Sequence, residues 1–287
     1  MKEWIKMFFK GILLGVWNHP WKTLGHIFSG FSISFTLIQI FQHFFPDQKF
    51  EGWIRFLCLA FVGIIYGVAR MRKPLSVRFD EITTTIEVIF GDLFQQEGLR
   101  AIPVNEFFDS KIGTPVSEKS LHGIFINKCF GGHPDVFDRA VEEQLFGKNF
   151  EEKTKTEGKT KSYPIGTTVI IQNTEKNNNV SYLAFALAKS RYDTCKAYCD
   201  VPTMWTALQG LWEKARNSSG GSTLNLPLVG SGQSGVNLCE ADLLDLIVIS
   251  ALTETRISRI TSKIRIVLHP RLFEKIDLRN LKRHSKG

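Results

Sequence analysis

The protein has 287 residues, 43% of them apolar, and a formal net charge of +8. Residues 1–79 contain ten Lys and Arg against three Asp and Glu, whereas residues 80–287 contain 26 against 25. A nucleic-acid-binding domain carries its basic charge on the folded domain itself. Here the basic part is also the most apolar part, so a membrane surface is favoured over DNA or RNA. Five scattered cysteines indicate no disulfide framework, which favours a reducing compartment.

Residues 1–17 have the pattern of an amphipathic helix. Lys2, Lys6 and Lys10 recur every four positions and so share one face, while aromatic and aliphatic side chains fill the rest of the surface. A helix of this kind lies in the membrane interface. The alternative, which the sequence leaves open, is that the segment extends the first spanning helix.

Two apolar runs follow and predict a transmembrane hairpin. Residues 24–45 contain no formal charge over 22 residues, which is enough for an α-helix to cross a hydrocarbon core of roughly 30 Å. Pro46 ends this run. The second run, residues 53–69, contains Arg55, whose long side chain can reach the headgroups. Two buried helices of a soluble protein are the alternative, and an uncharged run beside a basic flank argues against it.

Basic residues flank the hairpin at both ends. Four lysines precede the first run and four Lys or Arg follow the second, whereas the loop between the runs contains only Lys49. By the positive-inside rule, both termini are cytoplasmic. We therefore expect a multi-pass protein of the cell (inner) membrane. Residues 70–79 are then a basic linker, and residues 80–287 form a cytosolic domain.

Beyond residue 80, strand-like and helix-like segments alternate. Apolar and β-branched segments predict strands at residues 83–90, 99–104, 167–172, 182–188, 223–229 and 263–268. Helical spacing of apolar residues predicts helices at residues 136–146, 203–215 and 240–252. This order predicts an α/β layered domain. Residues 147–162 are highly charged and of low complexity, which predicts a solvated surface loop.

A glycine-rich loop between a predicted strand and a predicted helix is the sharpest local signal for a ligand. After Val229 it consists of Gly230, Ser231, Gly232, Gln233, Ser234 and Gly235. Glycines allow close backbone approach, and successive N–H groups before a helix favour phosphate. The loop fits neither a dinucleotide-binding βαβ unit, which needs an acidic residue after a second strand, nor a Walker loop, which needs Lys where Val236 stands. A glycine turn without a ligand is the alternative.

Two further candidate segments follow earlier strands. Asp92 and Leu93 come directly after the first predicted strand, where the carboxylate either caps a helix or accepts hydrogen bonds from an adenine amino group. Pro103 and Asn105 end the second strand. Ligands of α/β proteins bind beyond the carboxyl ends of strands. The next small-residue segment consists of Ser120, Leu121, His122 and Gly123.

In this order, the stretches FGDLF, IPVNEFFD, SLHGIFI and LPLVGSGQSG resemble the macro domain, an ADP-ribose-binding fold. The closer resemblance is to the divergent macro domain of Thoeris anti-phage effectors, which place it behind an N-terminal membrane hairpin. It covers about residues 80–270. The resemblance implies a macro-domain-like α/β/α sandwich with a mixed sheet, preceded by a two-helix transmembrane hairpin.

The same resemblance implies roles for the candidate residues. Asp92 would take the adenine end of the ligand, and Asn105 would lie near the distal ribose. The segments 120–123 and 230–235 would be the two loops that embrace the diphosphate. Ordinary macro domains follow this asparagine with small residues and glycines, whereas here Glu106, Phe107 and Phe108 follow it, and the second loop holds His122. These bulkier groups argue against hydrolase activity. They favour a pocket that recognises an additional group attached to ADP-ribose.

The function that the resemblance implies is a membrane-anchored sensor and effector without catalytic residues or a cofactor. Its ligand would be an ADP-ribose derivative such as histidine-linked ADP-ribose, made by a TIR-domain partner protein. Binding would drive homo-oligomerisation and disruption of the membrane lipids. Two alternatives stay open, a membrane-tethered ADP-ribosyl hydrolase that uses Asn105 and a structural membrane adaptor. Two Cys and Cys/His spacings do not match compact zinc sites, so no metal is predicted.

Overall fold

The computed structural model describes residues 2–46, 52–81, 83–173, 180–232 and 235–286, and it divides into two compact units. The first unit comprises Met1–Leu75 and Asp277–Asn280, and the second comprises Ser76–Ile276 and Leu281–Gly287.

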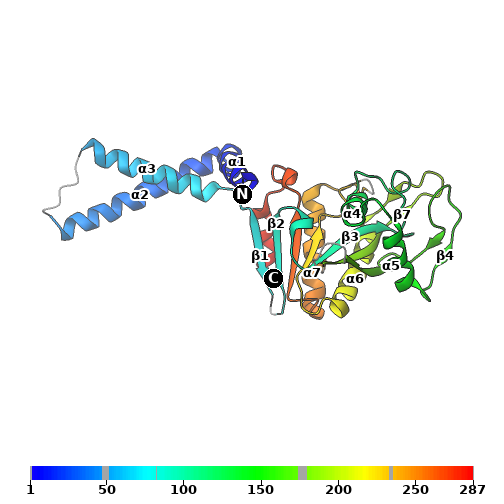
Figure 1. Ribbon diagram of the computed structural model, residues 1–287. Helices are drawn as coiled ribbons and strands as arrows, with labels where there is room; N and C mark the ends of the chain where they lie inside the picture. The colour runs from blue at the N-terminus through cyan, green and yellow to red at the C-terminus, as the bar shows by residue number, and fades with distance from the viewer. Residues whose placement is uncertain (1, 47–51, 82, 174–179, 233–234, 287) are drawn as a thin grey trace. The chain divides into compact units, whose positions relative to one another are not determined.

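In the first unit, α2 (Pro20–Phe44) and α3 (Trp53–Met71) run side by side (Figure 1). Glycines allow this close approach. A Cβ atom on Gly63 would lie 2.8 Å from the carbonyl oxygen of Ile27, and one on Gly67 would lie 2.8 Å from the Ile27 nitrogen. Both helices are long and apolar enough to cross a membrane. Large aliphatic and aromatic side chains on their outward faces are exposed. Residues 47–51, in the predicted loop between the two apolar runs, lie outside the described residues.

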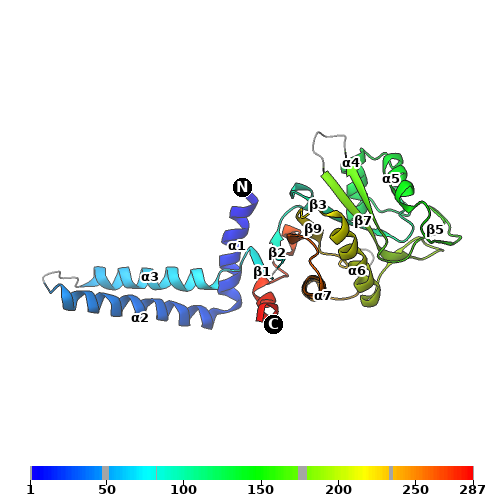
Figure 2. The same cartoon turned by 90° about the horizontal axis from the view of Figure 1, so that it is seen from below.

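The N-terminal helix α1 (Lys2–Asn18) is separate from α2. The backbone leaves the helical region at His19, with φ −140° and ψ 59°, so α1 is not a continuous extension of the first apolar helix. It crosses the end of the hairpin (Figure 2). Its glycine face packs on the end of α3, where the Lys73 N–H donates to the Gly11 carbonyl at 3.2 Å. A Cβ atom on Gly15 would lie 1.9 Å from the Met71 carbonyl oxygen.

The second unit is built on one mixed sheet. Its strand order is β1-β2-β10-β9-β3-β7-β6, and β8 pairs with β7. The strands are β1 (Ser76–Asp80), β2 (Thr85–Phe90), β3 (Leu99–Asn105), β6 (Thr168–Asn173), β7 (Val180–Ser190), β8 (Ala197–Tyr198), β9 (Leu224–Pro227) and β10 (Lys263–Leu268). The strands from β2 to β7 in this order are parallel, and β1 and β6 are antiparallel to their neighbours. All the parallel strands therefore end at the same edge of the sheet.

Helices cover both faces of this sheet (Figures 1 and 2). On one face, α4 (Leu121–Phe130) and α5 (Asp135–Leu145) form a core with the inward side chains of β3, β6 and β7. On the other face lie α6 (Val201–Ser218) and α7 (Glu240–Ile257), joined by a 2.9 Å hydrogen bond from the buried Trp212 indole to Ser250. The 3-10 helices are η1 (Leu93–Gln95), η2 (Pro270–Leu272) and η3 (Leu278–Lys286). This α/β sandwich with a mixed sheet confirms the predicted fold class.

Most predicted elements occur within a few residues of their expected bounds, and three regions differ. The edge strand β1 occupies part of the predicted linker 70–79, because alternating Val77 and Phe79 are buried. Residues 121–130 form α4, which includes most of the segment 120–123 that was predicted to be a loop. The predicted solvated loop 147–162 contains a two-stranded hairpin, β4 (Glu151–Glu152) and β5 (Lys161–Ser162), and some of its charged side chains are buried.

Candidate ligand-binding site

The carboxyl edge of the parallel strands gathers three of the four predicted segments. Asp92 follows β2, the glycine-rich loop follows β9, and Asn105 is the last residue of β3. The strand order places β10 and β9 between β2 and β3. An extended ligand on this edge would therefore pass from Asp92 across the glycine-rich loop to Asn105.

Asp92 caps η1, as its alternative interpretation predicted. Its Oδ1 accepts a hydrogen bond from the Phe94 N–H at 2.9 Å, and its Oδ2 lies 3.7 Å from the Lys128 ammonium. The side chain is still 39% exposed, so capping does not close it off from a ligand. Leu93 is buried in the core and supports the turn instead of facing solvent.

The glycine-rich loop contains glycines of two kinds. Gly230 has φ +81°, and a Cβ atom there would lie 2.8 Å from Val236 Cγ2, so the turn itself requires glycine. A Cβ atom on Gly232 would meet nothing within 4 Å. Ser231 is exposed like Gly232, and Val229 is buried. The Gly235 N–H donates to the Gly232 carbonyl at 3.1 Å. The remaining two predicted residues, Gln233 and Ser234, lie outside the described residues.

The segment Ser120–Gly123 was predicted to be a loop, but the structure shows that it is the start of α4. Ser120 is the N-cap, and its Oγ accepts a hydrogen bond from the Gly123 N–H at 3.0 Å. Gly123 is needed for packing, because a Cβ atom there would lie 2.3 Å from the Ser117 carbonyl oxygen. Apolar side chains at helical spacing bury this segment against the sheet, and Leu121 packs on the core.

The His122 side chain points into the core. Its ring lies 5.4 Å from the Phe137 ring, centroid to centroid, and within the described part of the chain its Nε2 has no hydrogen-bond partner. Burial and, to a smaller extent, the positive charge of Lys159 together lower the pKa of His122 to about 3. The imidazole is therefore neutral at pH 7, and its role here is packing.

Asn105 organises the turn that follows β3. Its Nδ2 donates to Asp109 Oδ2 at 2.8 Å, and its Oδ1 accepts from the backbone N–H groups of Phe107 and Asp109, each at 3.2 Å. Phe107 and Phe108 are both buried, and Phe108 has φ 51°, an uncommon conformation for a bulky residue. These phenylalanines therefore fill the space beneath the turn and do not face a ligand. Pro103 lies half-buried within β3.

A lysine-rich segment, residues 151–162, covers this turn. Lys155 forms an ion pair with Asp109, and both side chains are 0% exposed. The Lys159 N–H donates to Asp109 Oδ1 at 2.8 Å, and the Lys159 ammonium lies 2.5 Å from Asp138 on α5. The expectation of a solvated loop is wrong here, because buried carboxylates attract the lysines inward.

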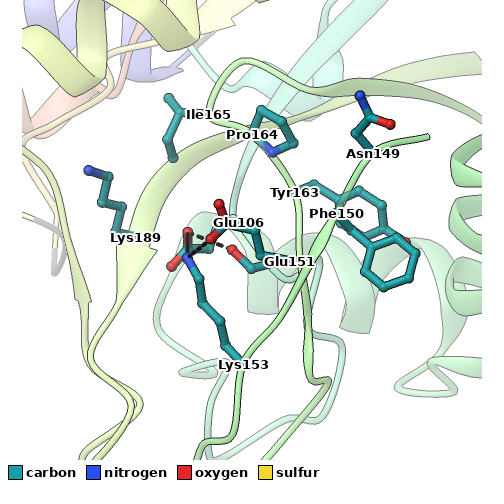
Figure 3. A pocket seen from close by; sticks show the side chains of 10 residues that line it. Glu106, Asn149, Phe150, Glu151, Lys153, Tyr163, Pro164, Ile165 and Lys189 are labelled. Carbon is teal, nitrogen blue, oxygen red and sulfur yellow. Dashed lines mark hydrogen bonds and ion pairs between the residues drawn. The ribbon is translucent and has the colours of Figure 1, made fainter.

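Next to this turn, a cavity of about 310 Å³ opens at the ends of β3 and β7 (Figure 3). Glu106 lies at its floor and is buried, accepting hydrogen bonds from Ser162 Oγ at 2.9 Å and the Ser190 N–H at 3.2 Å. The Lys153 ammonium lies between Glu106, at 3.9 Å, and Glu151, at 3.1 Å. Burial alone would lower the pKa of Lys153, but bonds to Tyr192 and Glu151 and the charge of Glu106 raise it.

Sequence reasoning identified Glu106 only as a departure from the macro-domain pattern and missed the lysines that meet it. One signal was present: Lys153 and Lys155 are two residues apart, so in extended chain they lie on the same side. The acidic partners Glu106 and Asp109 are distant in sequence, and only the fold pairs them. Among the described residues, no group of three or more His, Cys, Asp or Glu comes together to hold a metal.

Comparison with known proteins assigns this fold. The family model of the Macro domain of the Thoeris protein ThsA matches residues 86–269. This match covers more than half of the chain and includes every candidate segment described above. The chain belongs to this family. No curated protein matches its sequence.

Solved macrodomains share the fold of this chain. The Oceanobacillus iheyensis macrodomain with ADP is 10% identical, with a TM-score of 0.51 over 73% of this chain and 96% of that chain. A mutant of the same macrodomain with ADPR is 10% identical, with a TM-score of 0.52 over 74% of this chain and 100% of that chain. At this identity the likeness establishes the fold alone.

Proposed function

We propose that the protein is a membrane-anchored Thoeris effector whose macro domain binds an ADP-ribose derivative. The observation that carries this proposal is the carboxyl edge of the sheet, where Asp92, the open Gly232 and Asn105 follow strands in the order that an extended ligand requires. Membership of the ThsA macro-domain family supports the ligand class. The two apolar helices with exposed outward faces support the anchor, with lipids as their partner. The basic residues at both ends of the hairpin support an orientation with both termini in the cytoplasm.

The ligand carries a further group beyond the distal ribose, and the cavity above Glu106 receives it. Glu106 directly follows Asn105, and a space of about 310 Å³ suits a small polar group such as the histidine of histidine-linked ADP-ribose. A TIR-domain protein is the source of this messenger. Binding favours a homo-oligomer in which the hairpins cluster and disrupt the membrane, and the ligand drives this only by its higher affinity for the assembled state.

The direct test measures ligand binding by the full chain in detergent micelles. ADP-ribose should raise the melting temperature of the wild type and of Gly232→Ala. It should not do so for Gly232→Glu, because the added carboxylate repels the diphosphate. Gly232 has open space around it, so the melting temperature without ligand should be the same in all three proteins. An unchanged response of Gly232→Glu would contradict the site.

The effector and the hydrolase make different predictions for the bound ligand. An effector binds the messenger without consuming it. Binding should then increase the oligomer size of the protein, measured by light scattering, and release dye from vesicles whose membrane contains the protein. A hydrolase turns over an ADP-ribosylated substrate and loses this turnover in Asn105→Ala. The observation against the hydrolase is the Asn105 turn, where buried Glu106, Phe107 and Phe108 stand in place of the small residues that follow this asparagine in ordinary macro domains.

A further inference from the structure

Helix α1 has one face that is fixed on the end of the hairpin. Met7, Gly11 and Gly15 are buried and recur every four residues, so they share this face. The Lys73 N–H donates to the Gly11 carbonyl, and a Cβ atom on Gly15 would overlap the Met71 carbonyl oxygen. The glycines therefore allow the backbone of α1 to lie directly against the end of α3, which holds the helix in place.

The hairpin determines how α1 would lie relative to a bilayer. Helices α2 and α3 are antiparallel, because a Cβ atom on Gly63 would meet Phe31 and one on Gly67 would meet Ile27. The start of α2 and the end of α3 therefore form one end of the hairpin, and α1 lies across it (Figure 2). When the hairpin spans a membrane, α1 runs along the membrane surface at this end.

The outward side of α1 combines large apolar side chains with lysines. The exposed apolar side chains are Trp4, Ile5, Phe9, Leu13 and Trp17. Lys6 and Lys10 are exposed beside them and lie about one helical turn apart. Tryptophan is enriched where the headgroups meet the acyl chains, because its ring is apolar and its N–H is polar. This side of α1 therefore suits the membrane interface.

The basic surface continues from α1 onto the adjoining ends of α2 and α3. Lys22, in the first turn of α2, and Arg70 and Arg72, at the end of α3, are exposed. The Arg72 guanidinium lies 4.6 Å from the centre of the Phe8 ring, which places it beside α1. Residues 4–46 and 52–75 contain no Asp or Glu, so within these ranges no carboxylate compensates the charge. This surface is therefore complementary to acidic headgroups.

We propose that α1 is an interfacial helix that binds acidic phospholipids, with Lys6 and Lys10 at the headgroup phosphates and the apolar side chains among the upper acyl chains. The class of lipid follows from charge. A phosphatidylglycerol headgroup is an anion, whereas the choline of phosphatidylcholine cancels the charge of its phosphate, so the basic surface attracts the first lipid only. This inference rests on the proposed function, in which the hairpin spans the membrane, and it adds the lipid class that the anchor selects.

Quenching of tryptophan fluorescence by brominated lipids tests the position of α1. The full chain is placed in vesicles of phosphatidylcholine and phosphatidylglycerol that carry bromine at a shallow or a deep acyl position. The quenched signal that is lost in Trp4→Phe and in Trp17→Phe reports each ring separately. These residues are 13 positions apart, about 20 Å along a helix. Shallow bromine should quench both rings equally, whereas unequal depths would mean that α1 crosses the membrane and would overturn the inference.

Native mass spectrometry of the full chain in neutral detergent micelles tests the lipid class. The wild type should bind phosphatidylglycerol more tightly than phosphatidylcholine. Lys6→Gln with Lys10→Gln should weaken phosphatidylglycerol binding about 25-fold, about fivefold for each lysine, and leave phosphatidylcholine binding unchanged. Lys119→Gln with Lys196→Gln is the matched control, because it removes the same charge from exposed positions of the second unit. An equal loss in the control, or no loss in the first pair, would contradict the inference.

The quenching experiment also separates this inference from the proposed function. Trp21 and Trp53 belong to the hairpin helices and are exposed, and Trp21→Phe and Trp53→Phe report them in the same way. If the lipids quench these two rings and leave Trp4 and Trp17 unquenched, the hairpin is in the membrane and the inference about α1 is wrong. If none of the four rings is quenched, the membrane anchor of the proposed function is itself wrong.

Discussion

The lysine-rich segment 151–162 and the glycine-rich loop 230–235 approach the same edge of the sheet, yet their compositions were poor guides to their exposure. The charged segment has Lys155 fully buried in an ion pair. The loop that was predicted to hold a ligand leaves Gly232 in open space, while Gly230 is enclosed. The difference lies in what each segment meets. Buried carboxylates of the Asn105 turn hold the lysines, whereas a Cβ atom on Gly232 would meet nothing within 4 Å.

The largest expected effect comes from breaking the contact of the lysine-rich segment. Lys155→Met leaves the buried Asp109 without its cation, which should lower the free energy of unfolding by about 3–5 kcal/mol. Chemical denaturation of the full chain in micelles measures this change. Lys111→Met is the control, because its ion pair with Glu157 is exposed and should contribute about 0.5 kcal/mol. Similar losses of unfolding free energy in both variants would show that burial does not increase the contribution of the ion pair to stability.

The same segment also influences His122, through Lys159. The pKa of His122 is about 3 in the folded chain, against 6.5 in the unfolded one. Below pH 6.5 the unfolded state therefore binds a proton that the folded state does not, and stability falls as the pH falls towards 3. The loss should be about 2 kcal/mol between pH 6.5 and pH 5.

Denaturation curves at several pH values check this dependence. His122→Phe removes the titrating group and keeps an aromatic ring beside Phe137, so its stability should vary less with pH over the same range. If wild type and variant lose stability in parallel, another group is responsible and His122 is not buried as described.

The smallest effects separate the two glycines of the other loop. Gly230→Ala places a Cβ atom at φ +81° and against Val236, which should cost about 1–2 kcal/mol. Gly232→Ala should change stability by less than about 0.5 kcal/mol, because nothing lies near its Cβ position. Melting temperatures of the two variants suffice for this comparison. Equal effects would contradict the difference between the enclosed Gly230 and the open Gly232.

Local patterns were sufficient for most of the fold. Alternating and continuous apolar runs predicted β2, β3, β6, β7, β9 and β10, and helical spacing predicted α5, α6 and α7. These elements have strong periodicity because each buries one face or both. The edge strand β1 was missed because its five residues include Arg78 and Asp80, which pair with each other at the surface. Helix α4 was missed because its first turn contains a glycine and reads as a loop.

The sequence by itself determined the apolar hairpin, the α/β class and the strand-end positions of Asp92 and Asn105, because each depends on residues close together in the chain. Only the tertiary structure decided that His122 turns inward, that Gly230 and Gly232 differ, and that Lys155 meets Asp109. These outcomes depend on pairing between segments up to 46 residues apart. A buried charge needs a partner of opposite charge, and whether a charge is buried depends on how the whole fold packs and not on any single segment.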